Sequence, residues 1–113
     1  MLGKIENDGA MNKADDRLIK DFIRVVESNG GYFLEVGVVG WDGPHRPYII
    51  WKVFRKWRHA PSAQRLAAAQ QKALQESRFF KICFTCHERN NVGHMFDSEI
   101  CQTCAEHDLG IVY

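Results

Sequence analysis

The sequence predicts an α+β protein with a small, mostly helical N-terminal part, a short β element, and a C-terminal module built on four cysteines. All four cysteines of the 113 residues lie between positions 83 and 104. Apolar residues recur at helical spacing in the first half, and the run from Tyr32 to Val39 is rich in strand-forming residues. We therefore divide the chain into an N-terminal part, residues 1–78, and a module, residues 79–113, docked on it.

Two segments of the N-terminal part predict helices. Asp15 to Glu27 carries an apolar stripe at helical spacing, Asn12 is placed to cap it, and the Ser-Asn-Gly-Gly run at 28–31 is expected to end it. Ala63 to Ser77 consists almost wholly of strong helix formers. Ser62 precedes that helix as its expected N-cap.

The segment between these helices is less uniform. Tyr32 to Val39 predicts a strand, and Trp41 to Pro47 predicts a loop because it holds two prolines. Tyr48 to Arg58 fits either a helix or a strand that pairs back on Tyr32 to Val39. The apolar period continues to Trp57, so we favour the helix.

The cysteines form two Cys-x-x-Cys pairs, Cys83 with Cys86 and Cys101 with Cys104, separated by fourteen residues. Two residues between thiols let a tight turn aim both sulfurs at one ion, and two pairs complete the tetrahedron of a closed, structural Zn²⁺ site. Two disulfides or a thioredoxin-like redox pair are the alternatives. His87 and His107 lie close enough in sequence to replace one thiolate in a Cys₃His site.

The cysteine region resembles the treble-clef zinc modules over residues 79–109. An aromatic, strand-like run from Arg78 to Ile82 leads into the first pair, Glu88 to Gly93 has the composition of turns, and the second pair opens one or two helical turns that Gly110 ends. A zinc ribbon, with the second pair on another hairpin, is the close alternative. The resemblance implies a metal site but no particular function, since such modules serve many functions.

The same cysteines also indicate the cellular compartment in which we expect the protein. No apolar run approaches the length of about 20 residues that a membrane helix needs, and residues 1–8 contain no hydrophobic signal region. We expect a cytoplasmic protein without membrane contact, because thiols stay reduced there and remain available to zinc.

Charge is unevenly distributed although the net charge is only +1. Residues 43–75 carry seven basic and no acidic side chains, so an anionic partner would be met there. The candidate nucleic-acid-binding residues are Arg46, Lys52, Arg55, Lys56, Arg58 and Arg65, and Lys72 could extend them. If residues 48–58 are helical, Lys52, Arg55 and Lys56 share one face.

We hypothesise a small zinc protein that binds nucleic acid through this basic segment in a regulatory or accessory role. The alternative is a protein-interaction module, of a kind common on phages and plasmids, that docks on and modulates host machinery. Its partner-binding candidates are Trp41, Trp51 and Trp57, with Tyr113 as a further anchor. The sequence leaves DNA, RNA or protein as partner, and the oligomeric state, open.

We expect neither a small-molecule substrate nor enzymatic activity. The sequence contains no Gly-rich phosphate loop, no His-Glu-x-x-His motif and no convincing Ser-His-Asp order. HNH-type nucleases also use a treble-clef scaffold, but the candidate catalytic residue His94 lacks a His or Asn partner at helical spacing.

Overall fold

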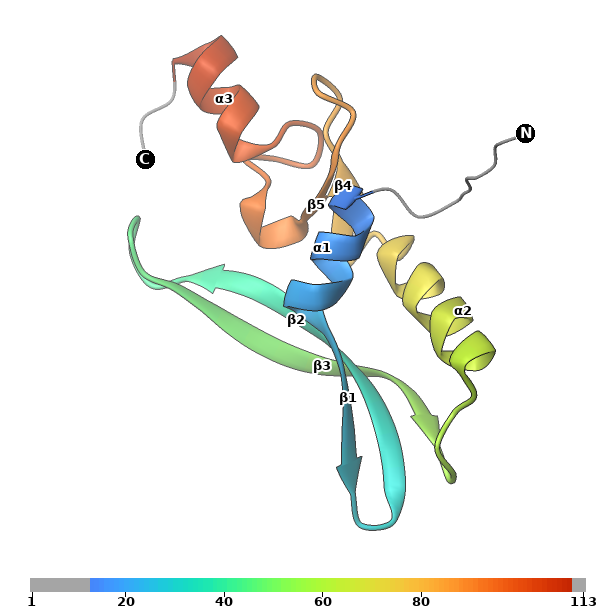
Figure 1. Ribbon diagram of the computed structural model, residues 1–113. Helices are drawn as coiled ribbons and strands as arrows, with labels where there is room; N and C mark the ends of the chain where they lie inside the picture. Colours follow the sequence, from blue (N-terminus) through green and yellow to red (C-terminus); the bar gives the residue numbers. More distant parts are fainter. Residues whose placement is uncertain (1–12, 111–113) are drawn as a thin grey trace, which may run out of the picture.

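The computed structural model describes residues 13–110, so the expected roles of Asn12 and Tyr113 lie outside the described residues. A three-stranded antiparallel sheet lies beneath two helices and the cysteine-containing module (Figure 1). In chain order the elements are α1 (Lys13–Phe22), β1 (Ile23–Ser28), β2 (Gly31–Trp41), β3 (Pro47–Trp57), α2 (Ala63–Leu74), β4 (Phe80–Ile82), β5 (Arg89–Asn91), η2 (Val92–His94) and α3 (Gln102–Leu109).

The N-terminal part is mostly strands, which corrects the expectation of a mostly helical part. The helix predicted over residues 15–27 ends at Phe22, and the following residues 23–28, three of which are β-branched, pair with residues 31–36 of β2. Asn29 and Gly30 have φ angles of 51° and 77°, which both positions of a tight two-residue hairpin turn require. The Asn-Gly pair therefore connects two strands and does not end a helix.

Residues 48–58 were also wrongly expected to be helical, since β3 runs over Pro47–Trp57 and pairs along β2. A β-bulge interrupts this pairing, because Leu34 lies opposite Arg55 while its neighbour Glu35 lies opposite Val53. The extra residue is Phe54.

The bulge decides which way the basic side chains of β3 point. Residues directly opposite each other share a sheet face, so Lys52, opposite Val36, and Arg55, opposite Leu34, lie on the face that carries the core. Lys56 lies opposite Phe33 on the other face. The expected single basic face of Lys52, Arg55 and Lys56 therefore does not form.

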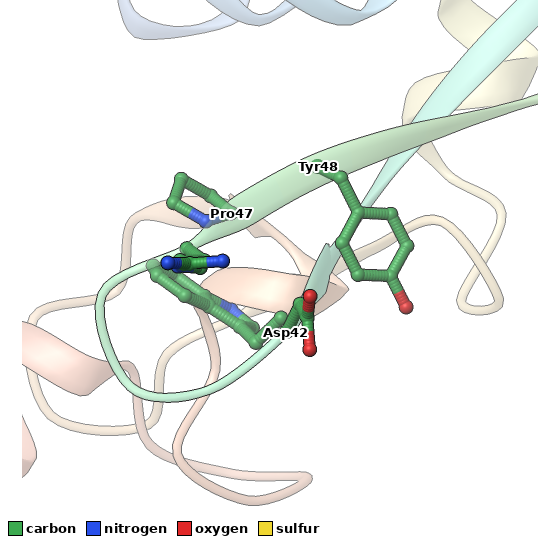
Figure 2. Close-up of a pocket in the computed structure, with 5 residues that line it drawn as sticks. Asp42, Pro47 and Tyr48 are labelled. Carbon is green, nitrogen blue, oxygen red and sulfur yellow. The ribbon is translucent and has the colours of Figure 1, made fainter.

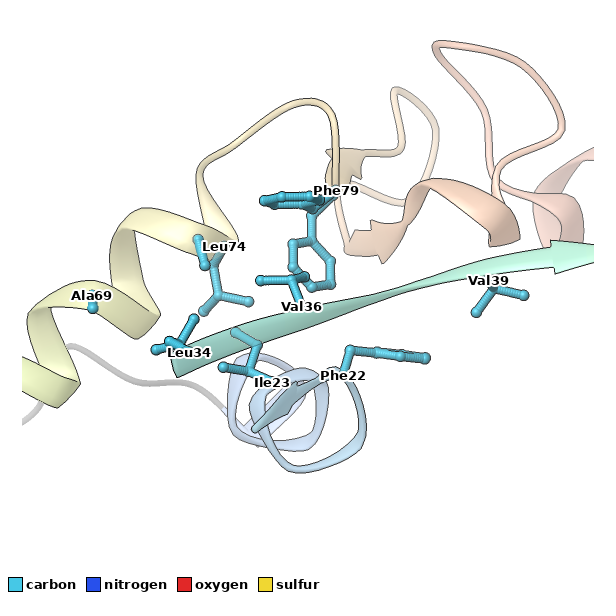
Figure 3. Packing of buried hydrophobic residues seen from close by; sticks show 10 residues of the cluster. Phe22, Ile23, Leu34, Val36, Val39, Ala69, Leu74 and Phe79 are labelled. Carbon is cyan, nitrogen blue, oxygen red and sulfur yellow. The ribbon is translucent and has the colours of Figure 1, made fainter. Parts of the chain in front are cut away.

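The main core lies between the sheet and α2. Leu34 and Val36 are fully buried, and Leu74 and Phe79 close over them from the end of α2 and the segment after it (Figure 3). Phe22 and Ile23 join from the α1–β1 junction. The helix predicted after Pro61 is confirmed, since Ser62 Oγ accepts a hydrogen bond from Arg65 N–H at 3.1 Å, although the helix ends at Leu74 and not at Ser77.

The cysteine module is joined to the sheet by the buried side chain of Asn91. β1 pairs with β2 only as far as Val36. Beyond that point the Asn91 amide accepts a hydrogen bond from Val39 N–H at 3.0 Å and donates one to the Gly37 carbonyl at 2.7 Å. A single side chain thus continues the sheet where β1 has ended.

Two further contacts fix this joint. At Gly93 of η2 an added Cβ would overlap the Val39 carbonyl oxygen, so only glycine allows the approach of η2 to β2. The guanidinium of Arg89 donates to both carboxylate oxygens of buried Asp15 at 2.8 Å, which ties β5 to α1. The module is therefore held by two elements of the N-terminal part, β2 and α1.

Candidate metal centre and basic cleft

The four cysteines are presented by a hairpin turn and by the start of a helix. Cys83 and Cys86 lie in the turn between β4 and β5. Residues 89–91, expected to be part of a turn, form the second strand of this hairpin. Cys101 is the N-cap of α3 and Cys104 lies in its first turn, so the second pair opens a helix rather than another hairpin.

The four thiols form one cluster. Their sulfurs all lie within 4.8 Å of one another, and none is in a disulfide. The sulfurs of Cys86 and Cys101 are 3.9 Å apart. A tetrahedral ion with Zn–S bonds of about 2.3 Å separates its sulfurs by about 3.8 Å, so the cluster could hold a metal ion of that kind. Among the described residues no histidine nitrogen belongs to the group, which leaves His87 and His107 outside it.

Cys83 is the best-prepared ligand. Its sulfur is buried and accepts backbone N–H bonds from Thr85, Cys86 and Cys101 at 3.3 to 3.4 Å. Burial raises the pKa of this thiol, but the three N–H groups outweigh burial and lower it to about 6. The lowered pKa favours the thiolate of Cys83, which is the form that binds metal.

Cys86 and Cys104 ionise less readily than Cys83. Burial, together with neighbouring sulfurs, raises the pKa of Cys86 and of Cys104. Four sulfurs in one place cannot all carry negative charge unless a cation lies between them, and a bound cation deprotonates coordinating thiols outright. The donor set thus fits a divalent, thiophilic metal.

The module has almost no apolar core of its own. Its buried cluster consists of Cys83, Met95 and Cys101, with Ile100 and Cys104 packed against it. Since three of these five residues are potential ligands, a bound metal would take the place of a hydrophobic core.

A second candidate site lies between β3 and α2. Arg55 and Trp57 of β3 and Arg65 and Lys72 of α2 line a cavity of about 280 Å³. Arg65 and Lys72 are seven residues apart and share a helix face, and the small side chains of Ala68 and Ala69 also line the cavity. We call this cavity the basic cleft.

The basic cleft contains no acidic side chain. Arg55, Arg65 and Lys72 are exposed, and the structure gives none of them an ion pair within residues 13–110. The guanidinium of Arg55 lies 5.8 Å from the centre of the Trp57 ring. The cleft thus combines three unneutralised cations with the exposed part of an indole ring.

The remaining candidates for nucleic-acid binding do not all join the cleft. Lys52 shares the core-bearing face with Arg55, whereas Lys56 lies on the opposite face and Arg58 follows the end of β3. Arg46 lies at the other end of the β2–β3 hairpin. Of the six residues predicted from sequence, Arg55 and Arg65 line the cleft, and Lys72 is added by α2.

The three tryptophans occupy separate places. Trp57 lines the basic cleft, and Trp51 lies beneath the Arg24 guanidinium at 3.9 Å, which is itself paired with Glu35. Trp41 donates its indole N–H to the Gly93 carbonyl at 2.7 Å and remains 38% exposed. They do not form one partner-binding surface.

Trp41 borders two hollows near the tip of the β2–β3 hairpin. One has a volume of about 500 Å³ and is also lined by Asp42, Arg46, Pro47 and Tyr48 (Figure 2). The other, of about 270 Å³, lies between the hairpin tip and Gln102 of α3. The apolar ring of Trp41 therefore lies beside both the tip of the β2–β3 hairpin and the cysteine module.

Comparison with models of protein families, with curated proteins and with solved structures gave no match to this chain. None of the helices in residues 13–110 has the length and apolar character required to cross a membrane.

Proposed function

We propose that this protein binds nucleic acid through the basic cleft, and that a structural Zn²⁺ ion held by the four cysteines stabilises the module beside it. Zinc is favoured because four thiolates at tetrahedral spacing suit it better than harder cations. The site has no open coordination position in this scheme, so the ion would act structurally and we propose no catalytic role. A thiolate site of this kind would operate in the reducing cytoplasm.

The convergence of cations in the basic cleft supports this proposal most strongly. Arg55 comes from β3 and two further cations come from α2, yet all three line one cavity that contains no acid. A purely solvated basic surface would be expected to interleave acids or spread its cations apart. Guanidinium groups suit phosphate oxygens, and the exposed part of Trp57 offers a surface on which an unpaired base can stack.

Charge reversal tests the proposal directly. In the double variant Arg65→Glu/Lys72→Glu, binding to single-stranded and duplex oligonucleotides at low salt should be lost. The melting temperature should change little because both side chains are exposed. The matched control is Arg17→Glu/Lys20→Glu, which makes the same charge change on exposed residues of α1. The control should retain most of the wild-type affinity.

Salt dependence provides a second measurement. For the single variants Arg65→Ala and Lys72→Ala, the slope of log K against log salt should fall by about 0.9 for each lost duplex phosphate contact, or about 0.7 for a single strand. Equal losses of affinity in the cleft variant and the α1 control would contradict a specific role for the cleft. So would a wild-type protein that binds neither oligonucleotide.

A protein partner is the second candidate, favoured by the exposed ring of Trp41 between two hollows. Aromatic anchors set in concave surfaces are typical of interaction hot spots. A partner bound there should be lost with Trp41→Ala and retained by the cleft variant Arg65→Glu/Lys72→Glu. Retention of the partner by Trp41→Ala would exclude this surface.

A further inference from the structure

We propose that the free edge of β3 is a homodimer interface, in which two copies pair antiparallel and join their sheets into one of six strands. The inference is independent of nucleic-acid binding. It starts from the strand order β1-β2-β3, which leaves β3 at the edge of the sheet. Long apolar edge strands pair readily with another chain unless they are protected.

The direction in which the backbone N–H and C=O groups of β3 point can be worked out from the hydrogen bonds of the Asn91 side chain. Its amide engages Gly37 and Val39 on the side of β2 that faces β1, so the alternating residue Val38 directs its backbone groups toward β3. The partner of Val38 is Ile50, which therefore points its own N–H and C=O inward. The residues at 49, 51 and 53 consequently present theirs outward, and no described backbone group bonds to them.

The side chains of this segment are as exposed as its backbone. Tyr48, Ile49, Ile50 and Val53 are between 42% and 48% exposed. Four large apolar side chains on one edge strand are unusual for a surface that stays in water.

The two usual protections of an edge strand limit this segment but do not cover it. Pro47 has no N–H to offer at one end, and the bulge at Phe54 breaks the regular strand at the other. Between Pro47 and the bulge lies a regular segment, residues 48–53. Because this segment is short, it can pair with an identical strand in only a few registers.

The charges favour a second copy of this chain as the occupant. When the two-fold axis passes beside Ile50, each Ile50 faces its counterpart and Ile49 faces Trp51. Lys52, the only charged residue between 47 and 53, then faces the ring of Tyr48, which can accept a cation. Within residues 47–53 no like charges are therefore placed directly opposite.

Measuring the molecular mass of the protein in solution tests whether the dimer forms. Wild-type protein loaded with zinc should show twice the chain mass at high concentration and dissociate on dilution. Ile49→Pro should remain monomeric and folded, because its N–H points outward and is not used within the chain. Ile49→Ala removes apolar bulk but keeps the N–H, so it should dimerise better than Ile49→Pro. A wild-type monomer at every concentration, or an Ile49→Pro dimer, overturns the proposal.

Cross-linking tests the register. Facing residues that are not hydrogen-bonded to each other have Cα atoms about 4.5 Å apart, which suits a disulfide. Ile50→Cys should therefore form a covalent dimer on mild oxidation with the metal site loaded. Two Lys52→Cys residues would lie about 13 Å apart along the strands, from a rise of about 3.3 Å per residue, and should not cross-link. Cross-linking of Lys52→Cys without that of Ile50→Cys overturns the pairing, as would equal dimerisation with an unrelated β-strand peptide.

Discussion

Replacing Asn91 with alanine should loosen the joint between the sheet and the cysteine module. The Asn91 side chain is fully buried and makes three hydrogen bonds to backbone groups, at 3.0 Å to Val39 N–H, 2.7 Å to the Gly37 carbonyl and 3.1 Å to Gly93 N–H. Leaving a buried polar group unsatisfied costs about 1–3 kcal/mol. The Val39 and Gly37 groups are buried, so Asn91→Ala should lower the free energy of unfolding by about 3–4 kcal/mol.

Chemical denaturation with zinc present measures this loss as a shift in midpoint at unchanged slope. The neighbouring variant Asn90→Ala is the matched control, because the Asn90 amide donates one exposed hydrogen bond, to the Glu88 carbonyl. Its cost should be within about 0.5 kcal/mol of zero, as for other surface substitutions. Amide exchange at Val39 should accelerate in Asn91→Ala alone. If the two variants destabilise the protein equally, Asn91 does not join the module to the sheet as argued.

The ligand set is the part of the site that sequence alone could predict. The spacing of two Cys-x-x-Cys pairs nominated four residues, and the structure places all four sulfurs in one cluster. Metal ligands are predictable because two-residue spacing is a local requirement of the turn that presents them. The end of α3 at Gly110 was also predictable from a local signal, because the φ of this residue is 69°, which glycine adopts readily.

The sheet was harder to predict because its signals compete with helical ones. The apolar stripe that runs into Val26 fits a helix by spacing, and only the pairing of β1 with β2 decides otherwise. The Asn-Gly dipeptide at 29–30 was the available signal, because it is the strongest short-range mark of a two-residue hairpin. Interpreting it as a helix end concealed the first hairpin.

The bulge explains why β3 resembled a helix. In a regular strand the core-facing residues recur every second position. The extra residue Phe54 shifts this period, so that Phe54 and Trp57, three residues apart, both pack against the core. This spacing coincides with a helical stripe. The same shift turns Arg55 toward α2, so the basic cleft depends on a feature that periodicity could not reveal.

Two predictions concern the metal and pH. Removing zinc with a strong chelator, or introducing Cys101→Ser, should accelerate amide exchange throughout residues 80–109 while β1 and its partner residues 31–36 of β2 stay protected. The reason is that structural zinc contributes about 10–16 kcal/mol of binding energy to a module with little core. Equal protection of the module in the variant would contradict this. The second prediction concerns His94, whose ring packs against Phe22 and Trp41 at centroid distances of 6.0 and 6.3 Å and whose burial lowers its pKa below 6.5. As the pH falls below 6.5 the unfolded chain takes up a proton that the folded chain resists, so stability declines until the lower folded pKa is reached. Denaturation midpoints measured between pH 7 and pH 5 should fall further in the wild type than in His94→Gln, and parallel pH profiles would refute a half-buried imidazole that resists protonation.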